Sequence, residues 1–174
     1  MADDMTTVFE LSGFCAAEAL LNLSEKYQTK LKPGEAALLP SIAIQNPAGK
    51  RHFTIFDEVT RQTFDKINEL LDQLSPSDKF AVVTSDGYVT INNRKFDAVQ
   101  LNGHLLSTPR RSFCIVLPYT HPDADRPFAF TRPGIASYDG FDIGSVDVSG
   151  AFNRGRDTHK DAQRIWQSFF RSEL

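Results

Sequence analysis

KFAVVTSDGYVTINNRKFDAVQL, residues 79–101, contains three runs rich in β-branched and aromatic residues, separated by turn residues. Ser85-Asp86-Gly87 is predicted to turn KFAVVT into YVTI, and NNRK (92–95) is predicted to turn YVTI into FDAVQL. Strands joined by connections this short pair in antiparallel fashion. The stretch therefore predicts a three-stranded meander.

The segments on either side extend the same sheet. SFCIVLPY (112–119) is a dense apolar run, typical of a central strand. Upstream, AALLPSIAIQ (36–45) and KRHFTIF (50–56) flank NPAG (46–49), which suits a type I turn closing with a bulge. Pro40 lacks an N–H for the ladder, so we expect this strand, or that end of it, to lie at an edge.

Two helices are predicted in the first half of the chain. Ser12 can cap a helix that runs to about Leu31, where the helix breakers of KPGE (32–35) end it. Asp57 opens a second helix to about Leu74, since apolar residues recur there at helical spacing.

A third helix is predicted at the end of the chain. Thr158, with Asp161 three residues later, resembles a capping box. The residues that follow place one apolar and aromatic stripe on a single helical face: Ala162, Ile165, Trp166, Phe169 and Phe170.

This pattern predicts the α+β class, with a mainly antiparallel sheet of five to six strands packed by an N-terminal, a middle and a C-terminal helix. Residues 1–11 are interpreted as a polar N-terminal leader and 12–174 as a single α+β domain. Between about 120 and 156, Pro, Gly, Asp and Ser dominate. That segment is predicted to be a long loop, either a structured cover or a functional loop.

Composition narrows the functional classes. The net charge of −3 does not provide a generally basic surface, so we expect no nucleic-acid partner. The acidic start does not resemble a secretory signal, and FCIVLPY (113–119) is too short to span a bilayer. Cys15 and Cys114 are not a CxxC pair and are interpreted as small buried hydrophobes. A cytoplasmic protein with no membrane association is the expectation.

YTHPDADRPF (119–128) places His121, Asp123 and Asp125 at alternate positions. On an extended segment these side chains would share one face, as an acid–base or metal site requires. The next histidine, His159, lies far along the chain, and prolines bracket the acids, as in a solvent-facing turn. The stretch is interpreted as a loop after a core strand, and these four residues are the candidates to test for catalysis.

Three basic pairs are candidates for contacts with an anion or a partner. They lie at turns or strand starts: Lys50 and Arg51, Arg94 and Lys95, Arg110 and Arg111. Several of them could form one patch if neighbouring turns share an end of the sheet. Alternatively, charges at strand ends keep the edges of a sheet soluble and unpaired.

No catalytic or nucleotide-binding motif is present. The sequence lacks G-x-G-x-x-G, the P-loop pattern and G-x-S-x-G, and NRGRD (153–157) has the wrong shape for a phosphate cradle. We expect no cofactor and no metal. A non-enzymatic binding or adaptor domain for a protein or a small ligand is favoured, with a protein partner or self-association. The alternatives are an enzyme whose pocket includes the 120–156 segment, and a small acidic chaperone-like or neutralising partner protein.

Overall fold

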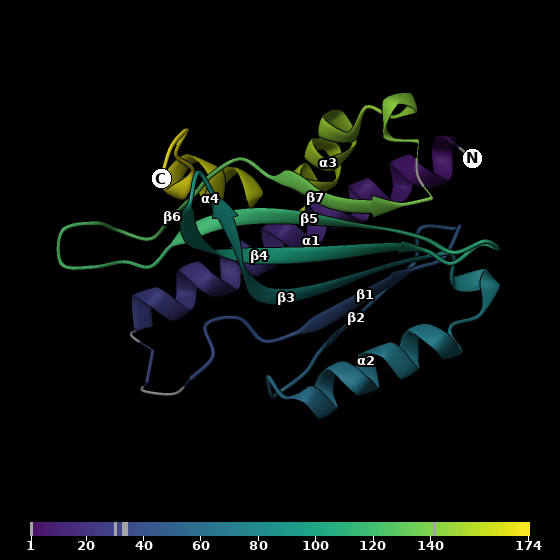
Figure 1. Ribbon diagram of the computed structural model, residues 1–174, viewed down its shortest axis with the longest axis horizontal. Coiled ribbons are helices and arrows are strands. Elements are labelled where there is room, and N and C mark those ends of the chain that lie inside the picture. Colours follow the sequence, from purple (N-terminus) through teal and green to yellow (C-terminus); the bar gives the residue numbers. More distant parts are fainter. Residues whose placement is uncertain (1, 30, 33–34, 141) are drawn as a thin grey trace.

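The computed structural model describes residues 2–29, 31–32, 35–140 and 142–174, and combines one antiparallel sheet with helices on both of its faces (Figure 1). The strands are β1 (Ser41–Gln45), β2 (Arg51–Ile55), β3 (Phe80–Ile91), β4 (Arg94–Leu105), β5 (Arg111–Thr120), β6 (Ala129–Phe130) and β7 (Gly134–Asp139). The helices are α1 (Ala2–Thr29), α2 (Arg61–Gln73), α3 (Val148–Asp157) and α4 (Ala162–Phe169), with short 3₁₀ turns at Pro76–Asp78 and Ile143–Ser145.

The sheet has the order β2-β1-β3-β4-β5-β6, and β7 also pairs with β5. All of these pairings are antiparallel, which confirms the predicted α+β class. The helices α1, α3 and α4 lie on one face of the sheet and α2 lies on the other (Figure 1). Among the described residues, no helix combines the length and the apolar character that a membrane span requires.

The predicted turn at Ser85-Asp86-Gly87 is wrong. These residues continue the ladder between β3 and β4, where Gly87 pairs with Ala98. The chain reverses only at Asn92 and Asn93, which both have positive φ (50° and 63°), as a two-residue hairpin turn requires. The turn signal is overridden because β3 and β4 pair without interruption over twelve positions, which include Ser85, Asp86 and Gly87.

The first hairpin has the predicted turn but not the predicted edge. Gly49 has φ of +81°, and its N–H donates to the carbonyl of Asn46 at 2.9 Å, which confirms the type I turn with a bulge. However, β1 lies between β2 and β3 and is an interior strand. Pro40 is compatible with that position because it directly precedes β1 and only its carbonyl is used, accepting from the Phe56 N–H at 2.9 Å.

The long helix α1 begins at Ala2 and not at Ser12. Ser12 is buried inside the helix, and its hydroxyl donates to the Val8 carbonyl at 2.9 Å. Met5, Val8 and Phe9, in the predicted leader, are buried as well. The predicted stop at KPGE includes Pro33 and Gly34, which lie outside the described residues.

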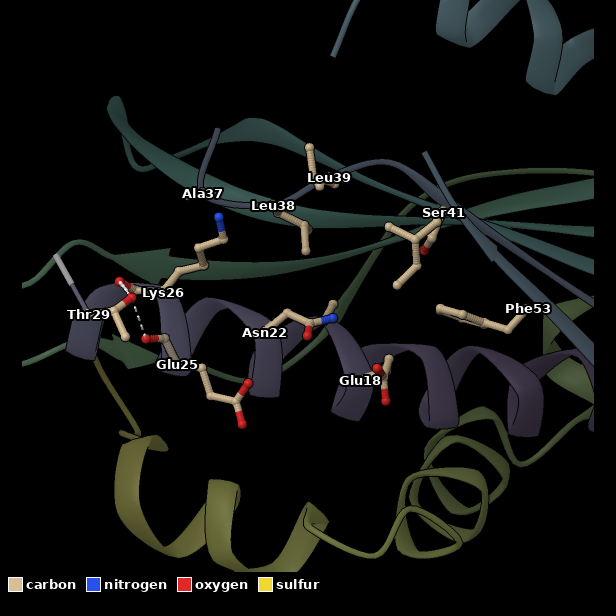
Figure 2. Close-up of a pocket in the computed structure, with 12 residues that line it drawn as sticks. Glu18, Asn22, Glu25, Lys26, Thr29, Ala37, Leu38, Leu39, Ser41 and Phe53 are labelled. Atoms are coloured by element: carbon tan, nitrogen blue, oxygen red, sulfur yellow. Dashed lines mark hydrogen bonds between the residues drawn. The ribbon is translucent and has the colours of Figure 1, made fainter. Parts of the chain in front are cut away.

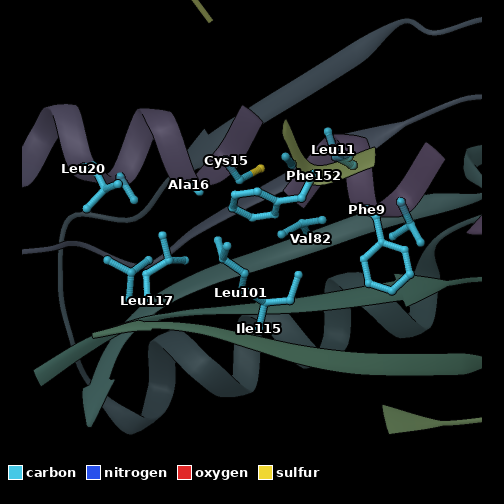
Figure 3. Packing of buried hydrophobic residues seen from close by; sticks show 14 of the residues in the cluster. Phe9, Leu11, Cys15, Ala16, Leu20, Val82, Leu101, Ile115, Leu117 and Phe152 are labelled. Carbon is cyan, nitrogen blue, oxygen red and sulfur yellow. The ribbon is translucent and has the colours of Figure 1, made fainter. Parts of the chain in front are cut away.

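The core of the α1 side lies between this helix and the sheet (Figure 3). Phe9, Leu20 and Phe152 on the helices meet apolar side chains from the strands, such as Leu101 and Leu117. A smaller core lies on the opposite face, where α2 packs onto β1 and β3. There, Ile67 and Leu71 contact a cluster that includes Ile42 and Val83. The N-cap of α2 is Thr60, three residues after the predicted Asp57.

The stretch predicted as a long loop, 120–156, contains regular structure: β6, β7 and most of α3. The predicted capping box at Thr158 is also wrong, because Thr158 ends α3 and its hydroxyl donates to the Gly155 carbonyl at 2.6 Å. The aromatic stripe of α4 does face the core. Ile165 is buried, and the Trp166 ring meets the Phe130 ring edge-on with centroids 4.9 Å apart.

The helices α1 and α3 cross in close contact at two glycines. A Cβ on Gly155 would lie 1.7 Å from the Glu10 carbonyl oxygen, and one on Gly13 would lie 1.9 Å from the Phe152 carbonyl oxygen. Neither backbone can yield without separating the helices. NRGRD is therefore part of a helix-packing site.

Gly155→Ala should lower the free energy of unfolding by about 1–3 kcal/mol, as overpacking does in a tight interior. Urea denaturation followed by circular dichroism measures this change. The control is Gly144→Ala, whose new methyl group would meet Asp142 Oδ1 at an ordinary 3.5 Å. Equal stability of the two variants would contradict the close helix crossing.

Candidate functional site

The strand β2 forms one edge of the sheet. All five of its residues are exposed, and among the described strands it pairs only with β1. A free edge presents unpaired backbone N–H and C=O groups that can pair with another strand. Charges, prolines and bulges commonly protect such edges, but β2 carries exposed Phe53 and Ile55.

The register of the hairpin identifies the backbone groups that face outward. The Asn46 N–H donates to the Lys50 carbonyl at 3.1 Å, and the Phe56 N–H donates to the Pro40 carbonyl at 2.9 Å. Hydrogen bonds in an antiparallel ladder alternate along each strand. The residues 52 and 54 therefore bond to β1, while the N–H and C=O groups of Arg51, Phe53 and Ile55 point away from the sheet.

The side chains of Phe53 and Ile55 point to the face that α1 covers, because Phe53 pairs with Ala43 of the α1-side core. They form one wall of a pocket of about 290 Å³, which we term the β2 groove (Figure 2). Its lining residues are Glu18, Ala19, Asn22, Glu25, Lys26, Thr29, Ala37, Leu38, Leu39, Ser41, Phe53 and Ile55.

The opposite wall of the β2 groove is polar and acidic. Glu18, Asn22 and Glu25 follow one another along α1 at helical spacing, across from Leu38 and Phe53 (Figure 2). Glu25 has no ion pair among the described residues.

A second hollow of about 490 Å³ adjoins the β2 groove, since both are lined by Lys26 and Leu39. It adds three carboxylates, those of Glu35, Asp57 and Glu58. Lys26 is the one basic residue that lines these two hollows within the described chain, and it is paired with Glu35. The site is therefore apolar on the strand side and negatively charged around it.

His159 lies next to this site, because its partner Glu18 lines the β2 groove. Its side chain is buried, its Nε2 lies 2.7 Å from a carboxylate oxygen of Glu18, and its Nδ1 accepts from the Asp161 N–H at 3.2 Å. Since Nδ1 accepts, Nε2 carries the proton and donates to Glu18. The pair joins the start of α4 to the middle of α1.

His121 belongs to a different cluster, at the end of α1. Its Nε2 lies 2.7 Å from a carboxylate oxygen of Asp97, and its Nδ1 is hydrogen-bonded to the Tyr27 hydroxyl. Beside it, the buried Tyr119 hydroxyl donates to Asp86 at 2.9 Å. Burial raises the pKa of Tyr27 to about 12 and raises the pKa of Tyr119 further above its usual range. Both phenols are therefore held neutral, the opposite of what an activated nucleophile needs.

The four candidates for catalysis are not brought together. His121 and His159 contact α1 at Tyr27 and Glu18, nine residues and about 13 Å apart along the helix. Asp123 closes a turn, where its Oδ1 accepts from the backbone N–H groups of Asp125 and Arg126, and these bonds lower its carboxyl pKa.

The basic pairs do not form one patch. Ile91 is paired with Arg94 across the sheet, so the basic residues 94 and 95 lie at one end of it. Ile44 is paired with Ala81, and Leu105 is paired with both Phe80 and Arg111, so the basic residues 50–51 and 110–111 lie at the other end. Most of these side chains have local partners in cation–π contacts, hydrogen bonds or ion pairs. These are Arg51 over Phe14 and bonded to Gln45, Arg94 over Phe96, Lys95 over Tyr88, and Arg110 with Asp72 and the Leu71 carbonyl.

Two features were not identified from the sequence. A groove of about 260 Å³ beneath α2 contains His104 and Cys114, and burial raises the pKa of that thiol. At the sheet edge opposite β2, a pocket of about 570 Å³ lies between β7 and the helices α3 and α4. We term it the aromatic pocket, and its lining includes Arg132, Ile135 and Trp166.

Comparisons with protein-family models, with curated proteins and with solved structures find no match to this chain. Within the described residues, no three His, Cys, Asp or Glu side chains are grouped so that they could hold a metal ion.

Cys15 should react with a thiol reagent only after unfolding. Burial raises its pKa to about 12, so at about pH 8 almost none of it is the thiolate that reacts. Titration with a chromogenic disulfide, in native buffer and in denaturant, counts the reactive thiols. Fast native labelling of Cys15, located by peptide mapping, would contradict its buried position.

The free edge of β2 gives a distinct pattern of amide hydrogen exchange. The amides of Phe53 and Ile55 should exchange quickly, and those of His52 and Thr54 slowly, because only the latter bond to β1. Two-dimensional NMR of the uniformly labelled protein in D₂O measures these four rates. Similar protection at all four positions would show that something already covers the edge.

Proposed function

We propose that this protein is a binding module that takes up an extended segment of a partner protein along β2. The observation that carries the proposal is the coincidence of a free strand edge with the β2 groove at the same residues. Phe53 and Ile55 offer their backbone groups to a new strand and their side chains to the groove. Strand addition draws affinity from main-chain hydrogen bonds and specificity from pockets for alternate side chains.

The apolar and acidic lining of the site favours one kind of partner segment. A strand next to β2 directs every second side chain to the α1 face, where Leu38, Phe53 and Ile55 favour aliphatic residues. Among the described residues, five carboxylates line the two adjoining hollows, against the single ammonium of Lys26. The preferred occupant is therefore an extended segment with aliphatic and basic residues on the same face.

A synthetic nonapeptide, Lys-Thr-Ile-Thr-Val-Thr-Leu-Thr-Lys with blocked ends, is a suitable probe. Its aliphatic and Lys residues share one face when it is extended. It should bind in a salt-sensitive manner, and the same peptide with Glu in place of Lys should bind more weakly. Calorimetry measures the affinity, and amide exchange should then slow at Phe53 and Ile55.

Ile55→Lys should weaken binding of the peptide about tenfold or more, because it places a charge in the apolar wall. Thr54→Lys is the matched control, since it adds the same charge to the same strand but on the α2 face. Equal binding by these two variants would overturn the proposal. So would a homodimer that Ile55→Lys converts to monomer, because the edge would then serve self-association.

A further inference from the structure

The aromatic pocket has a separate chemistry at the other edge of the sheet. It has a volume of about 570 Å³, within the range of small-molecule sites. Its walls come from segments far apart in the sequence: Ile115 of β5, Ile135 of β7, Phe152 of α3, and Trp166 and Phe170 at α4. The Trp166 and Phe170 rings are only partly buried, so part of their apolar surface remains open to the pocket.

Among the described residues, two arginines and no acidic residue line the aromatic pocket. Arg132 is exposed and has no ion pair or hydrogen bond among the described residues. Arg156 lies over the Trp166 ring, 5.0 Å from its centroid, and donates to Asp157 at 2.7 Å. The chain has a net charge of −3, whereas the described lining of this pocket carries positive charge and no carboxylate.

The balance of these charges favours a monoanion. Asp157 offsets much of the charge of Arg156, so about one positive charge, that of Arg132, remains uncompensated. The N-terminus of α3 supplies no further anion site, because the Asp147 carboxylate occupies it and accepts from the Gly150 N–H at 2.9 Å. A carboxylate matches a single guanidinium in charge and can accept two parallel hydrogen bonds from it.

We propose that the aromatic pocket binds a small carboxylic acid with an apolar body. The apolar part lies among Ile115, Ile135, Phe152 and Trp166, and the carboxylate faces Arg132. This site does not depend on the proposed function of the β2 groove, since β2 and β7 lie at opposite edges of the sheet.

Trp166 lines the pocket and is the one tryptophan of the chain, so its fluorescence can report ligand binding there. Octanoate, added up to millimolar concentrations, should change the emission of Trp166 in a saturable manner. The alcohol 1-octanol has the same chain without the charge and should bind more weakly. Octyl phosphate tests whether a dianion is preferred.

Arg132→Ala should weaken octanoate binding about tenfold or more, as expected for loss of a charge-assisted hydrogen bond. Arg126→Ala is the matched control. It also removes one exposed arginine, which pairs with Asp123 and does not line the pocket. Binding of octanoate to this control should equal that of the unaltered protein.

Several outcomes would overturn the proposal. The absence of a saturable change in Trp166 emission would exclude binding of this class of ligand. Equal affinity for octanoate and octanol would show an apolar pocket without an anion site. Tighter binding of octyl phosphate would assign a dianion. Equal weakening by the two arginine variants would indicate a general charge effect.

Discussion

The burial of α1 between the sheet and the helices α3 and α4 is the constraint on which the rest of the structure depends. Gly13 and Gly155 allow the α1 and α3 backbones to approach to a distance that no side chain would permit. Apolar side chains of α1 can then meet both the sheet and the shorter helices. Because two of its sides are covered, every α1 residue from Asp4 to Ser24 is buried or partly buried.

This arrangement also creates the two candidate sites. The helix α1 packs over β3 and β4, so the sheet projects beyond it on both sides. On one side the flank of α1 and the edge strand β2 enclose the β2 groove. On the other side, β7 and the helices α3 and α4 enclose the aromatic pocket. Both hollows lie at margins of the sheet, beside the strands that α1 covers.

The two margins of the sheet differ in charge, which the net charge of −3 does not indicate. Carboxylates surround the β2 groove, whereas arginines line the aromatic pocket. Elsewhere, the titratable groups mainly support the fold: His159 joins α4 to α1 through Glu18, and burial raises the pKa of Cys15. Burial likewise keeps the phenols of Tyr27 and Tyr119 in their neutral forms.

Local patterns in the sequence predicted the antiparallel α+β class, the NPAG turn and the aromatic face of the last helix, because each depends on neighbouring residues. The start of α1 was not predictable in this way. A helix covered on two sides lacks a single apolar stripe, so its first residues resembled a polar leader. Residues 85–87 have the composition of a turn, and only their pairing with β4 shows that they lie inside a strand.

The sequence by itself also drew attention to His121, Asp123, Asp125 and His159, but only the tertiary structure could show that His121 and His159 contact different parts of α1. Likewise, no local pattern relates Glu25 to Phe53, or Arg132 to Trp166. The sequence determined most of the strands up to Thr120 and the first, middle and last helices, since periodicity and turn chemistry are short-range properties, but it did not indicate β6, β7 or α3. The tertiary structure decided which edge stays open and which side chains share a pocket, because these depend on how distant segments pack.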